Sequence, residues 1–390
     1  MMTTEARYAA ALEVLRGPTW IRRPLAARGY DDGSAGWSSL YARFNPGDVP
    51  WAWFVFRNDR HPEHTVRIEV FPEDRAPHHA IDIPTVGPAT VEEVTHDAQL
   101  PGLRRLLEGA TVEVLRYRPG RRCTLKVGAT AHHPPRIAKL FHDARGAEID
   151  YWTRRVYGAA GDGWLPFRVP EPLGWDADDR VLWQELLPGG RILPILLGSA
   201  GPALARRVGE AAGSIPAADL PAGDVLDAPG QLERTARVAR GLARRIPELE
   251  SLLDAVLARL EALHGRWSVR LRSVHGAPHP EQWLLADDTL GLVDFDRYGL
   301  AEPELDCATF VAEVDFEAVS EAHRAAVTEA FIEGYEHTAG PLIRPLLEVY
   351  RQHKHLAKAL RYARAVRPDG TRRACDLVHA IHTRVKELPR

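Results

Sequence analysis

Residues 274–283 read V-H-G-A-P-H-P-E-Q-W, and this stretch gives the clearest indication of the fold. It is followed by residues 290–296, L-G-L-V-D-F-D, an apolar run that predicts a strand. Asp294 comes at the end of that run, where a strand end would present its carboxylate. The glycine and the two prolines of the first stretch predict a loop ahead of the strand. A structural hairpin is the simplest interpretation, but it leaves the polar residues of both segments unexplained.

These polar residues have the spacing of a phosphoryl-transfer site. In kinase folds, a catalytic-loop Asp accepts the proton of the substrate hydroxyl, an Asn five positions later holds a metal, and an Asp on a following strand end holds the nucleotide-bound metal. Counted from His275, which is itself a candidate catalytic residue, the base position is Ala277 and the metal positions are Gln282 and Asp294. The amide oxygen of Gln282 is an acceptable ligand for Mg²⁺, whereas Ala277 cannot act as a base.

The motif H-G-x-x-H-P-x-x with a later D-F-D resembles the aminoglycoside phosphotransferase family, also called the phosphotransferase enzyme family. Family members read H-G-D-x-H-P-x-N, so this sequence departs from the pattern at Ala277 and Gln282. The resemblance implies an α+β, bilobal protein-kinase-like fold with a β-rich N-lobe and a helical C-lobe. It also implies ATP or GTP as the phosphate donor, Mg²⁺ as the metal, and a hydroxyl group as the acceptor.

Upstream residues occupy positions where this resemblance places the nucleotide. Residues 112–127 predict a hairpin with a Pro-Gly turn, and the family's nucleotide-covering loop lies there, so Arg121 is a candidate phosphate ligand unless it is simply solvated. Lys139, on a predicted strand at residues 136–141, matches the phosphate-binding lysine of kinases; the alternative is a surface lysine on an edge strand. Glu148 and Asp150, on a predicted helix, are candidate ion-pair partners for it.

A further apolar strand, residues 180–187, precedes Pro-Gly-Gly and corresponds to the segment that leads into the family's hinge. The resemblance therefore places Gln184, Glu185 and Leu187 at the nucleotide site. We expect three parts in the chain: an extra β-rich N-terminal region at residues 1–100, the kinase-like N-lobe at 101–187, and the helical C-lobe at 188–390. The tryptophans of the first part predict either core packing or an aromatic platform for a ligand.

Composition limits the class of protein. Of the 390 residues, 45% are apolar and 26% are charged, as in ordinary globular proteins, and the net charge of −3 does not favour nucleic-acid binding. The three widely spaced cysteines indicate a reducing cytoplasm rather than a disulfide framework. Residues 1–8 lack the apolar segment of a signal peptide, and no apolar run reaches the ~18 residues of a membrane span. The oligomeric state stays open.

Two helical segments carry opposite charge. Residues 302–321 hold seven carboxylates and no Lys or Arg, which predicts a solvated helix face or a surface that receives a cationic substrate. Within this segment, Asp306 matches a family Asp that helps to hold the catalytic loop. The basic residues near the end of the chain could balance the acidic helix or bind an anionic ligand. They recur at helical spacing: Arg351, Lys354, Lys358, Arg361, Arg364 and Arg367.

Ala277 leaves the function divided between two classes. The first is an ATP- or GTP-dependent phosphotransferase, here in a version inactivated at Ala277; a neighbouring carboxylate such as Glu281 could instead supply the base. The second is a natural pseudokinase that binds nucleotide or substrate as a partner protein. For the phosphotransferase, the acceptor is a small molecule such as an aminoglycoside or a sugar, or a peptide Ser/Thr hydroxyl.

Overall fold

The structure of the chain is a computed structural model, and it forms two compact units. It describes residues 10–15, 19–30, 36–45, 48–61, 64–109, 111–267, 270–365 and 369–389. The first unit contains Met1–Ala147, Leu173–Gln184 and Arg361–Arg373, and the second contains Glu148–Pro172, Glu185–Leu360 and Ala374–Arg390. The residues of the signal-peptide prediction, 1–8, and the last basic residue of the tail, Arg367, lie outside the described residues.

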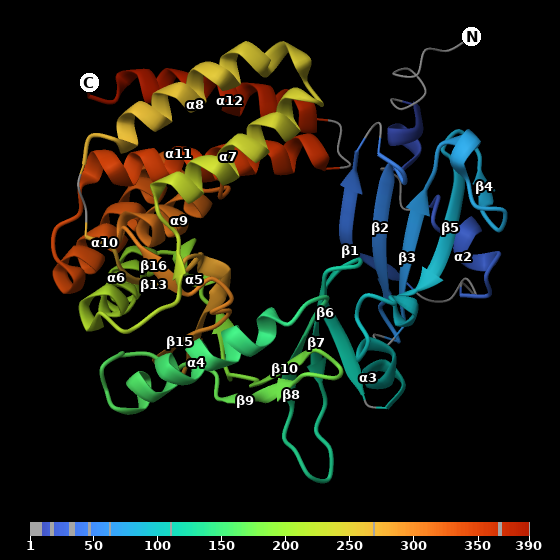
Figure 1. Cartoon of the computed structure of the whole chain (residues 1–390), viewed down its shortest axis with the longest axis horizontal. Coiled ribbons are helices and arrows are strands. Elements are labelled where there is room, and N and C mark those ends of the chain that lie inside the picture. The colour runs from blue at the N-terminus through green and yellow to red at the C-terminus, as the bar shows by residue number, and fades with distance from the viewer. Residues whose placement is uncertain are drawn as a thin grey trace. The chain divides into compact units, whose positions relative to one another are not determined.

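The first unit begins with a five-stranded antiparallel sheet in the order β1-β2-β3-β5-β4, drawn from blue to cyan in Figure 1. Alternating apolar residues build it, because every second side chain of a strand faces the same side; in β3, Val66, Ile68 and Val70 are all buried. Trp20 and Trp51 are also buried, so they pack in the core. The elements are α2 (Arg22–Ala26), β1 (Trp37–Phe44), β2 (Ala52–Asn58), β3 (Thr65–Val70), β4 (Ile81–Ile83), β5 (Gly87–Glu93) and the 3-10 helices η1 (Glu73–Arg75) and η2 (Val94–His96).

A second five-stranded sheet has the order β6-β7-β8-β10-β9. Its first two strands form the predicted hairpin: the turn closes with the Arg121 amide donating to the Arg118 carbonyl at 3.0 Å, and Gly120 takes the positive φ of +65° that glycine tolerates. The elements are α3 (Leu103–Gly109), β6 (Val112–Arg118), β7 (Arg122–Val127), β8 (Arg136–Phe141), β9 (Pro172–Asp176) and β10 (Val181–Glu185).

The two sheets share a core within the first unit. Val55 of β2 is fully buried in the same apolar cluster as the inward side chains of β6, β7 and β8. Arg57 of β2 pairs with Glu113 of β6 at 2.8 Å and also donates to the Val114 carbonyl at 3.3 Å. The N-terminal region and the sheet of the kinase-like N-lobe are therefore one packed body.

The second unit is mainly helical and contains two small sheets, β11-β14-β15 and β12-β16-β13. Helices α6 and α10 pack closely at Gly209. A Cβ on this glycine would lie 2.0 Å from the Phe331 carbonyl oxygen, so only glycine allows this approach. The helices are α4 (Arg145–Gly161), α5 (Leu193–Leu196), α6 (Gly201–Ala218), α7 (Ala228–Ala243), α8 (Glu250–His264), α9 (Glu304–Val314), α10 (Glu321–Ala339), α11 (Arg344–Arg364) and α12 (Gly370–Glu387). The short elements are β11 (Gly190–Arg191), β12 (Asp224–Val225), η3 (Pro247–Leu249), β13 (Arg272–Val274), η4 (Pro280–Gln282), β14 (Trp283–Ala286), β15 (Thr289–Leu292) and β16 (Gly299–Ala301).

The acidic and basic segments pair with each other. Asp315, the residue after α9, accepts two hydrogen bonds from the guanidinium of Arg351 on α11 and one at 2.8 Å from His355. Lys358 lies 3.2 Å from Glu313, one turn further along α11. Charge balance between the two helices therefore describes these residues better than separate ligand-binding faces.

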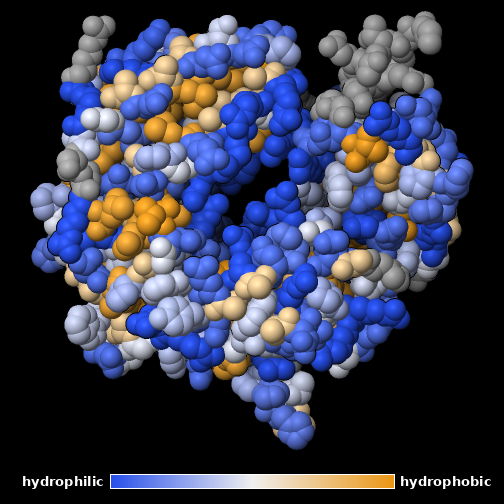
Figure 2. Space-filling view, in the orientation of Figure 1, coloured by the Kyte–Doolittle hydropathy of each residue, from blue (hydrophilic) through white to orange (hydrophobic). Residues whose placement is uncertain are grey.

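The fold class expected from the resemblance is confirmed: a β-rich part, a helical part and an additional N-terminal sheet are all present. Figure 2 shows hydrophilic residues over most of the visible face of both units. Among the described residues, no helix combines the length and the apolar content that crossing a membrane requires.

Two histidines form a buried polar chain in the helical unit. The Nε2 atoms of His264 and His353 are 2.8 Å apart, and Thr235 Oγ1 lies 2.6 Å from His353 Nδ1. Burial lowers the pKa of His264 to about 4, and burial together with the neighbouring His264 and Lys354 lowers the pKa of His353 well below its usual value. His264 Nδ1 has no hydrogen-bond partner among the described residues, so an imidazolium would bury an unpaired N–H there.

Acidification is therefore expected to destabilise the helical unit through these rings. An unfolded histidine takes up a proton near pH 6.5, whereas folded His264 resists protonation to about pH 4, so its contribution is complete above pH 6.5 and is lost as pH falls toward 4. The loss from this residue is on the order of 3 kcal/mol. Denaturant unfolding at pH 7, 6, 5 and 4 measures it. His264→Phe should flatten the profile, whereas His132→Gln, at an exposed histidine, should leave it unchanged; an unaltered slope in His264→Phe would contradict the assignment.

Candidate active site

The loop after β13 is hydrogen-bonded to Asp306 of α9. The backbone amide of His275 donates to Asp306 Oδ2 at 2.7 Å, and the amide of Gly276 donates to Oδ1 at 2.8 Å. Burial raises the pKa of the Asp306 carboxyl to about 7, although both amides and the charge of Lys354 lower it. The expected role of Asp306 as a buried acceptor that supports this loop is confirmed.

His275 and Gly276 fix the loop to the following strand. Gly276 has φ +81°, and a Cβ at this position would lie 2.2 Å from the Arg297 carbonyl oxygen, so only glycine fits. The His275 ring is buried, donates from Nε2 to the Val293 carbonyl at 3.1 Å, and packs edge-on against Phe295 at 4.6 Å. This geometry gives His275 a positioning role, because its ring joins the loop to the two residues that flank Asp294.

Ala277 begins a tight turn that its side chain does not help to form. The His279 amide donates to the Ala277 carbonyl at 2.8 Å, and the Trp283 indole donates to the Pro278 carbonyl at 3.3 Å. Ala277 is partly exposed. A longer polar side chain at this position would therefore reach solvent without disturbing the backbone hydrogen bonds that shape the loop.

Gln282 and Asp294 lie side by side. Gln282 is 6% exposed, its Nε2 donates to Asp294 Oδ2 at 3.1 Å, and its backbone carbonyl accepts from the Val293 amide at 3.1 Å. The other amide atom, Gln282 Oε1, is buried and has no hydrogen-bond partner among the described residues. Asp294 follows β15 with φ +73°, a left-handed conformation that costs free energy and is found at functional sites.

The oxygen atoms of this pair are of the kind that could hold a magnesium ion. Mg²⁺ prefers oxygen ligands and is usually bound through one or two carboxylates, with phosphates and waters completing its shell. Asp294 offers the carboxylate, and Gln282 Oε1 is a neutral oxygen to which no described residue donates a hydrogen bond. The substitution of Gln for the family's Asn thus keeps a usable metal ligand.

Among the candidate nucleotide residues of the first unit, Lys139 has the clearest position. It lies on β8, the middle strand of its sheet, opposite Thr124 of β7, and is 6% exposed. The alternative of an exposed edge-strand lysine is therefore wrong. Arg121 is exposed in the hairpin turn, and Gln184 is buried on β10.

The remaining candidates belong to the second unit. Glu185 pairs with Arg168 at 2.9 Å and accepts from the Glu171 amide at 3.1 Å, so its carboxylate already has partners, whereas Leu187 is buried. Glu148 is exposed in the first turn of α4. The division between the two units falls between Gln184 and Glu185, inside the segment expected to be the hinge.

The neighbours of Glu148 and Ala277 also have partners. Asp150 pairs with Arg154 one turn along α4 at 2.8 Å. Glu281, the alternative base, forms an ion pair with Arg191 of β11. No sequence pattern points to Arg191, because it is distant in the chain and precedes an unremarkable apolar segment.

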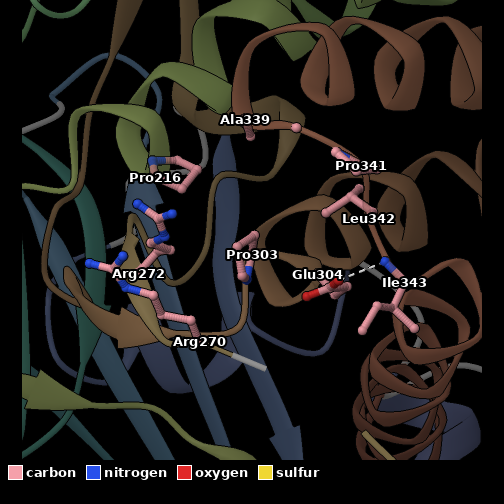
Figure 3. A pocket seen from close by; sticks show the side chains of 10 residues that line it. Pro216, Arg270, Arg272, Pro303, Glu304, Ala339, Pro341, Leu342 and Ile343 are labelled. Carbon is pink, nitrogen blue, oxygen red and sulfur yellow. Dashed lines mark hydrogen bonds between the residues drawn. The ribbon is translucent and has the colours of Figure 1, made fainter. Parts of the chain in front are cut away.

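A cavity of about 170 Å³ lies elsewhere in the second unit (Figure 3). Arg270 and Arg272, which pair with Asp219, line one side, and Glu304, which accepts from the Ile343 amide at 2.8 Å, lies on the other. None of the candidate catalytic or metal residues lines it. The cavity is therefore separate from the site around Asp294.

Residues 108–353, more than half of the chain, match the sequence model of the phosphotransferase enzyme family, and the chain belongs to that family. The resemblance drawn from residues 274–296 is thus confirmed. No curated protein sequence matches the chain.

Several solved structures are similar in fold. A choline kinase from Cryptosporidium parvum has a TM-score of 0.50 at 14% identity, over 74% of this chain and 93% of that chain. Choline kinase LicA from Streptococcus pneumoniae has a TM-score of 0.49 at 16% identity, over 69% and 93%. An aminoglycoside phosphotransferase from Streptomyces rimosus has a TM-score of 0.47 at 18% identity, over 65% and 96%. At such identities, the likeness to the Cryptosporidium structure supports the kinase-like fold and nothing further.

Proposed function

We propose that this chain is built to move the γ-phosphoryl group of ATP or GTP to a hydroxyl of a small molecule, with Ala277 in the place of the catalytic base. In that reaction the bond between the γ-phosphorus and the bridging oxygen breaks and releases ADP or GDP, a new bond to the acceptor oxygen forms, and the acceptor's proton passes to a catalytic base, which is the carboxylate that Ala277 lacks. Asp294 and Gln282 would hold Mg²⁺, which would neutralise charge on the phosphates. The nucleotide would contact Lys139, Arg121, Gln184, Glu185 and Leu187. Glu148 would form an ion pair with Lys139.

One observation carries this proposal: the buried, unpaired Oε1 of Gln282 beside a carboxylate whose backbone is held at φ +73°. A buried polar atom without a partner costs about 1–3 kcal/mol, and a left-handed Asp costs a similar amount. Two such costs in adjacent side chains are explained if a cation binds there. Family membership supplies the donor chemistry that makes this cation a nucleotide-bound magnesium.

The acceptor and the status of Ala277 are the open parts of the proposal. Membership of the phosphotransferase enzyme family supports a small-molecule acceptor, and a peptide Ser/Thr hydroxyl is the second candidate. The alternative function is a natural pseudokinase that binds nucleotide and acts as a partner protein. The Asp306–His275–Gly276 framework is intact, and both functions would use it, because it holds the loop at Ala277 and also contacts the residues beside Asp294.

Calorimetric titration of the chain with ATP and with GTP tests the site directly. Because loss of a base removes no phosphate or metal ligand, we expect at least one nucleotide to bind with a dissociation constant below about 1 mM, or −4 kcal/mol, when Mg²⁺ is present. Chelation of Mg²⁺ should weaken that binding. Heat signals that are absent for both nucleotides at millimolar concentration would contradict the kinase-like site, and equal affinity with and without Mg²⁺ would contradict the metal assignment.

A further inference from the structure

Asp97 connects the N-terminal region to the tip of the hairpin formed by β6 and β7. It follows η2, is 7% exposed, and lies outside the residues that match the family. Its Oδ2 accepts from the Tyr117 hydroxyl at 2.7 Å and from the Gly120 backbone amide at 2.7 Å. Its Oδ1 accepts from the Gln99 amide at 3.0 Å. One carboxylate therefore receives three hydrogen bonds, and two of them come from the hairpin.

These contacts fix the hairpin at the end of β6 and within its turn. Tyr117 is buried at the end of β6, and burial together with the charge of Asp97 raises the pKa of its hydroxyl, which keeps the hydroxyl protonated as a donor. Gly120 is at the turn itself, where the Arg121 amide closes onto the Arg118 carbonyl at 3.0 Å. Fully satisfied buried networks of this kind rigidify the backbone that they hold.

Glycine and the charged residues of this turn would otherwise be mobile. A Pro-Gly hairpin tip with exposed arginines has few apolar contacts of its own, and a loop with few such contacts opens easily. The two hydrogen bonds from the hairpin to Asp97 replace those contacts, and Asp97 lies between Val94 and Leu100, which are buried in the shared core of the two sheets. The N-terminal sheet thus gives the hairpin a fixed base.

We propose that Asp97 is a positioning residue that holds the β6–β7 hairpin in the conformation that receives the nucleotide phosphates. This inference rests on the proposed function, since it takes the hairpin as the nucleotide-covering loop. Because the Gly120 amide is committed to Asp97, the phosphates would be met by other donors of the turn, including the Arg121 side chain. A loop ordered in advance binds more tightly than one that must be ordered by its ligand.

The test compares Asp97→Ala and Asp97→Asn with a matched control, Arg57→Gln. The control removes the ion pair to Glu113, which also joins the N-terminal sheet to β6 but does not touch the hairpin tip. Two quantities are measured in the full-length chain: hydrogen exchange of the Gly120 amide after ¹⁵N-glycine labelling, and the affinity for Mg²⁺–ATP by calorimetry. Thermal unfolding of all three variants provides the measure of general destabilisation.

We expect Asp97→Ala to accelerate Gly120 exchange and to weaken Mg²⁺–ATP binding by about tenfold, the effect of losing a hydrogen bond to a charged group. Asp97→Asn should lie between, because its amide oxygen still accepts one bond. Arg57→Gln should lower the unfolding temperature while leaving both quantities unchanged. Loss of affinity in Arg57→Gln equal to that in Asp97→Ala would overturn the specific role of Asp97.

Further outcomes separate this inference from the proposed function. Unchanged Gly120 exchange in Asp97→Ala would overturn the anchor itself. Faster exchange with unchanged or tighter Mg²⁺–ATP binding would overturn the positioning role, and tighter binding would mark Asp97 as a competitor of the phosphates. If the unmodified chain bound no nucleotide while Asp97→Ala still accelerated Gly120 exchange, the proposed function would fail and the anchor would stand.

Discussion

Ala277→Asp is expected to raise phosphoryl transfer from an undetectable rate to a measurable one, by about 10²–10⁴-fold, or roughly 3–5 kcal/mol of barrier. The expectation follows from the loop, whose shape is set by backbone hydrogen bonds and by Asp306 rather than by the side chain at 277. A carboxylate on this partly exposed residue would leave those backbone hydrogen bonds in place. Steady-state release of ADP or GDP, first with water and then with a panel of aminoglycosides, sugars, amino alcohols and Ser/Thr peptides, measures the gain.

The matched control for this gain is Ala277→Asn, which has nearly the same shape as Ala277→Asp but cannot accept a proton as a carboxylate does. If both variants bind Mg²⁺–nucleotide like the unmodified chain and only Ala277→Asp turns over, the missing base is the sole defect. If Ala277→Asp binds nucleotide and yet transfers phosphate to no acceptor and to no water, the pseudokinase alternative is correct.

Asp294→Asn is expected to remove most of the magnesium-dependent affinity for nucleotide, a loss of about 100-fold, because Asp294 is the carboxylate of the metal pair. The fold should survive, since Asn tolerates the left-handed backbone of this residue and can keep a hydrogen bond to Gln282. Calorimetry with and without Mg²⁺ measures the affinity, and a circular dichroism melt reports the fold.

Asp288→Asn is the matched control for Asp294. Asp288 also has a positive φ, +64°, but it lies exposed in the turn between β14 and β15 and pairs with Arg207 at 2.7 Å. Its substitution should change neither nucleotide affinity nor the response to Mg²⁺. An Asp294→Asn variant with undiminished magnesium dependence would assign Asp294 a structural role instead.

Local patterns were sufficient to predict the family and the two segments that carry the candidate site. The apolar run before Asp294 indicates the end of a strand. Gly276 and Asp306 match motif positions, and the structure shows that the loop depends on a tight turn and on the buried Asp306 carboxylate. The structure adds the left-handed backbone of Asp294 and the unpaired oxygen of Gln282. Neither is visible in a sequence, because both depend on how two segments meet.

Contacts between distant residues could not be predicted. Asp97 and Gly120 are joined by a hydrogen bond between the segment after η2 and the turn of the β6–β7 hairpin, and nothing in the local sequence around Asp97 marks it as an acceptor for that amide. The end of a helix is also hard to predict from local sequence. Proline usually ends a helix, but α6 continues to Ala218 with Pro216 inside it. Close packing against α10 outweighs the local cost of a proline within the helix.

Charged segments show a similar limit. Composition indicates that residues 302–321 are acidic and that the tail is basic, but it leaves open whether either surface serves a ligand. The structure resolves this for Asp315, which is shared by Arg351 and His355, and for Glu313, which pairs with Lys358. Pairing across helices is a property of the fold, so charge counts alone do not identify a substrate surface.

We propose that this site is a phosphotransferase centre that lacks only the carboxylate at Ala277. Transfer of the labelled γ-phosphoryl group, measured side by side in the unmodified chain, Ala277→Asp, Asp294→Asn and the double variant, tests it most directly. We predict label transfer or hydrolysis in Ala277→Asp only, with the activity lost again in the double variant because the metal ligand is gone. Equal background rates in all four proteins, despite Mg²⁺–nucleotide binding by the first two, would contradict the claim.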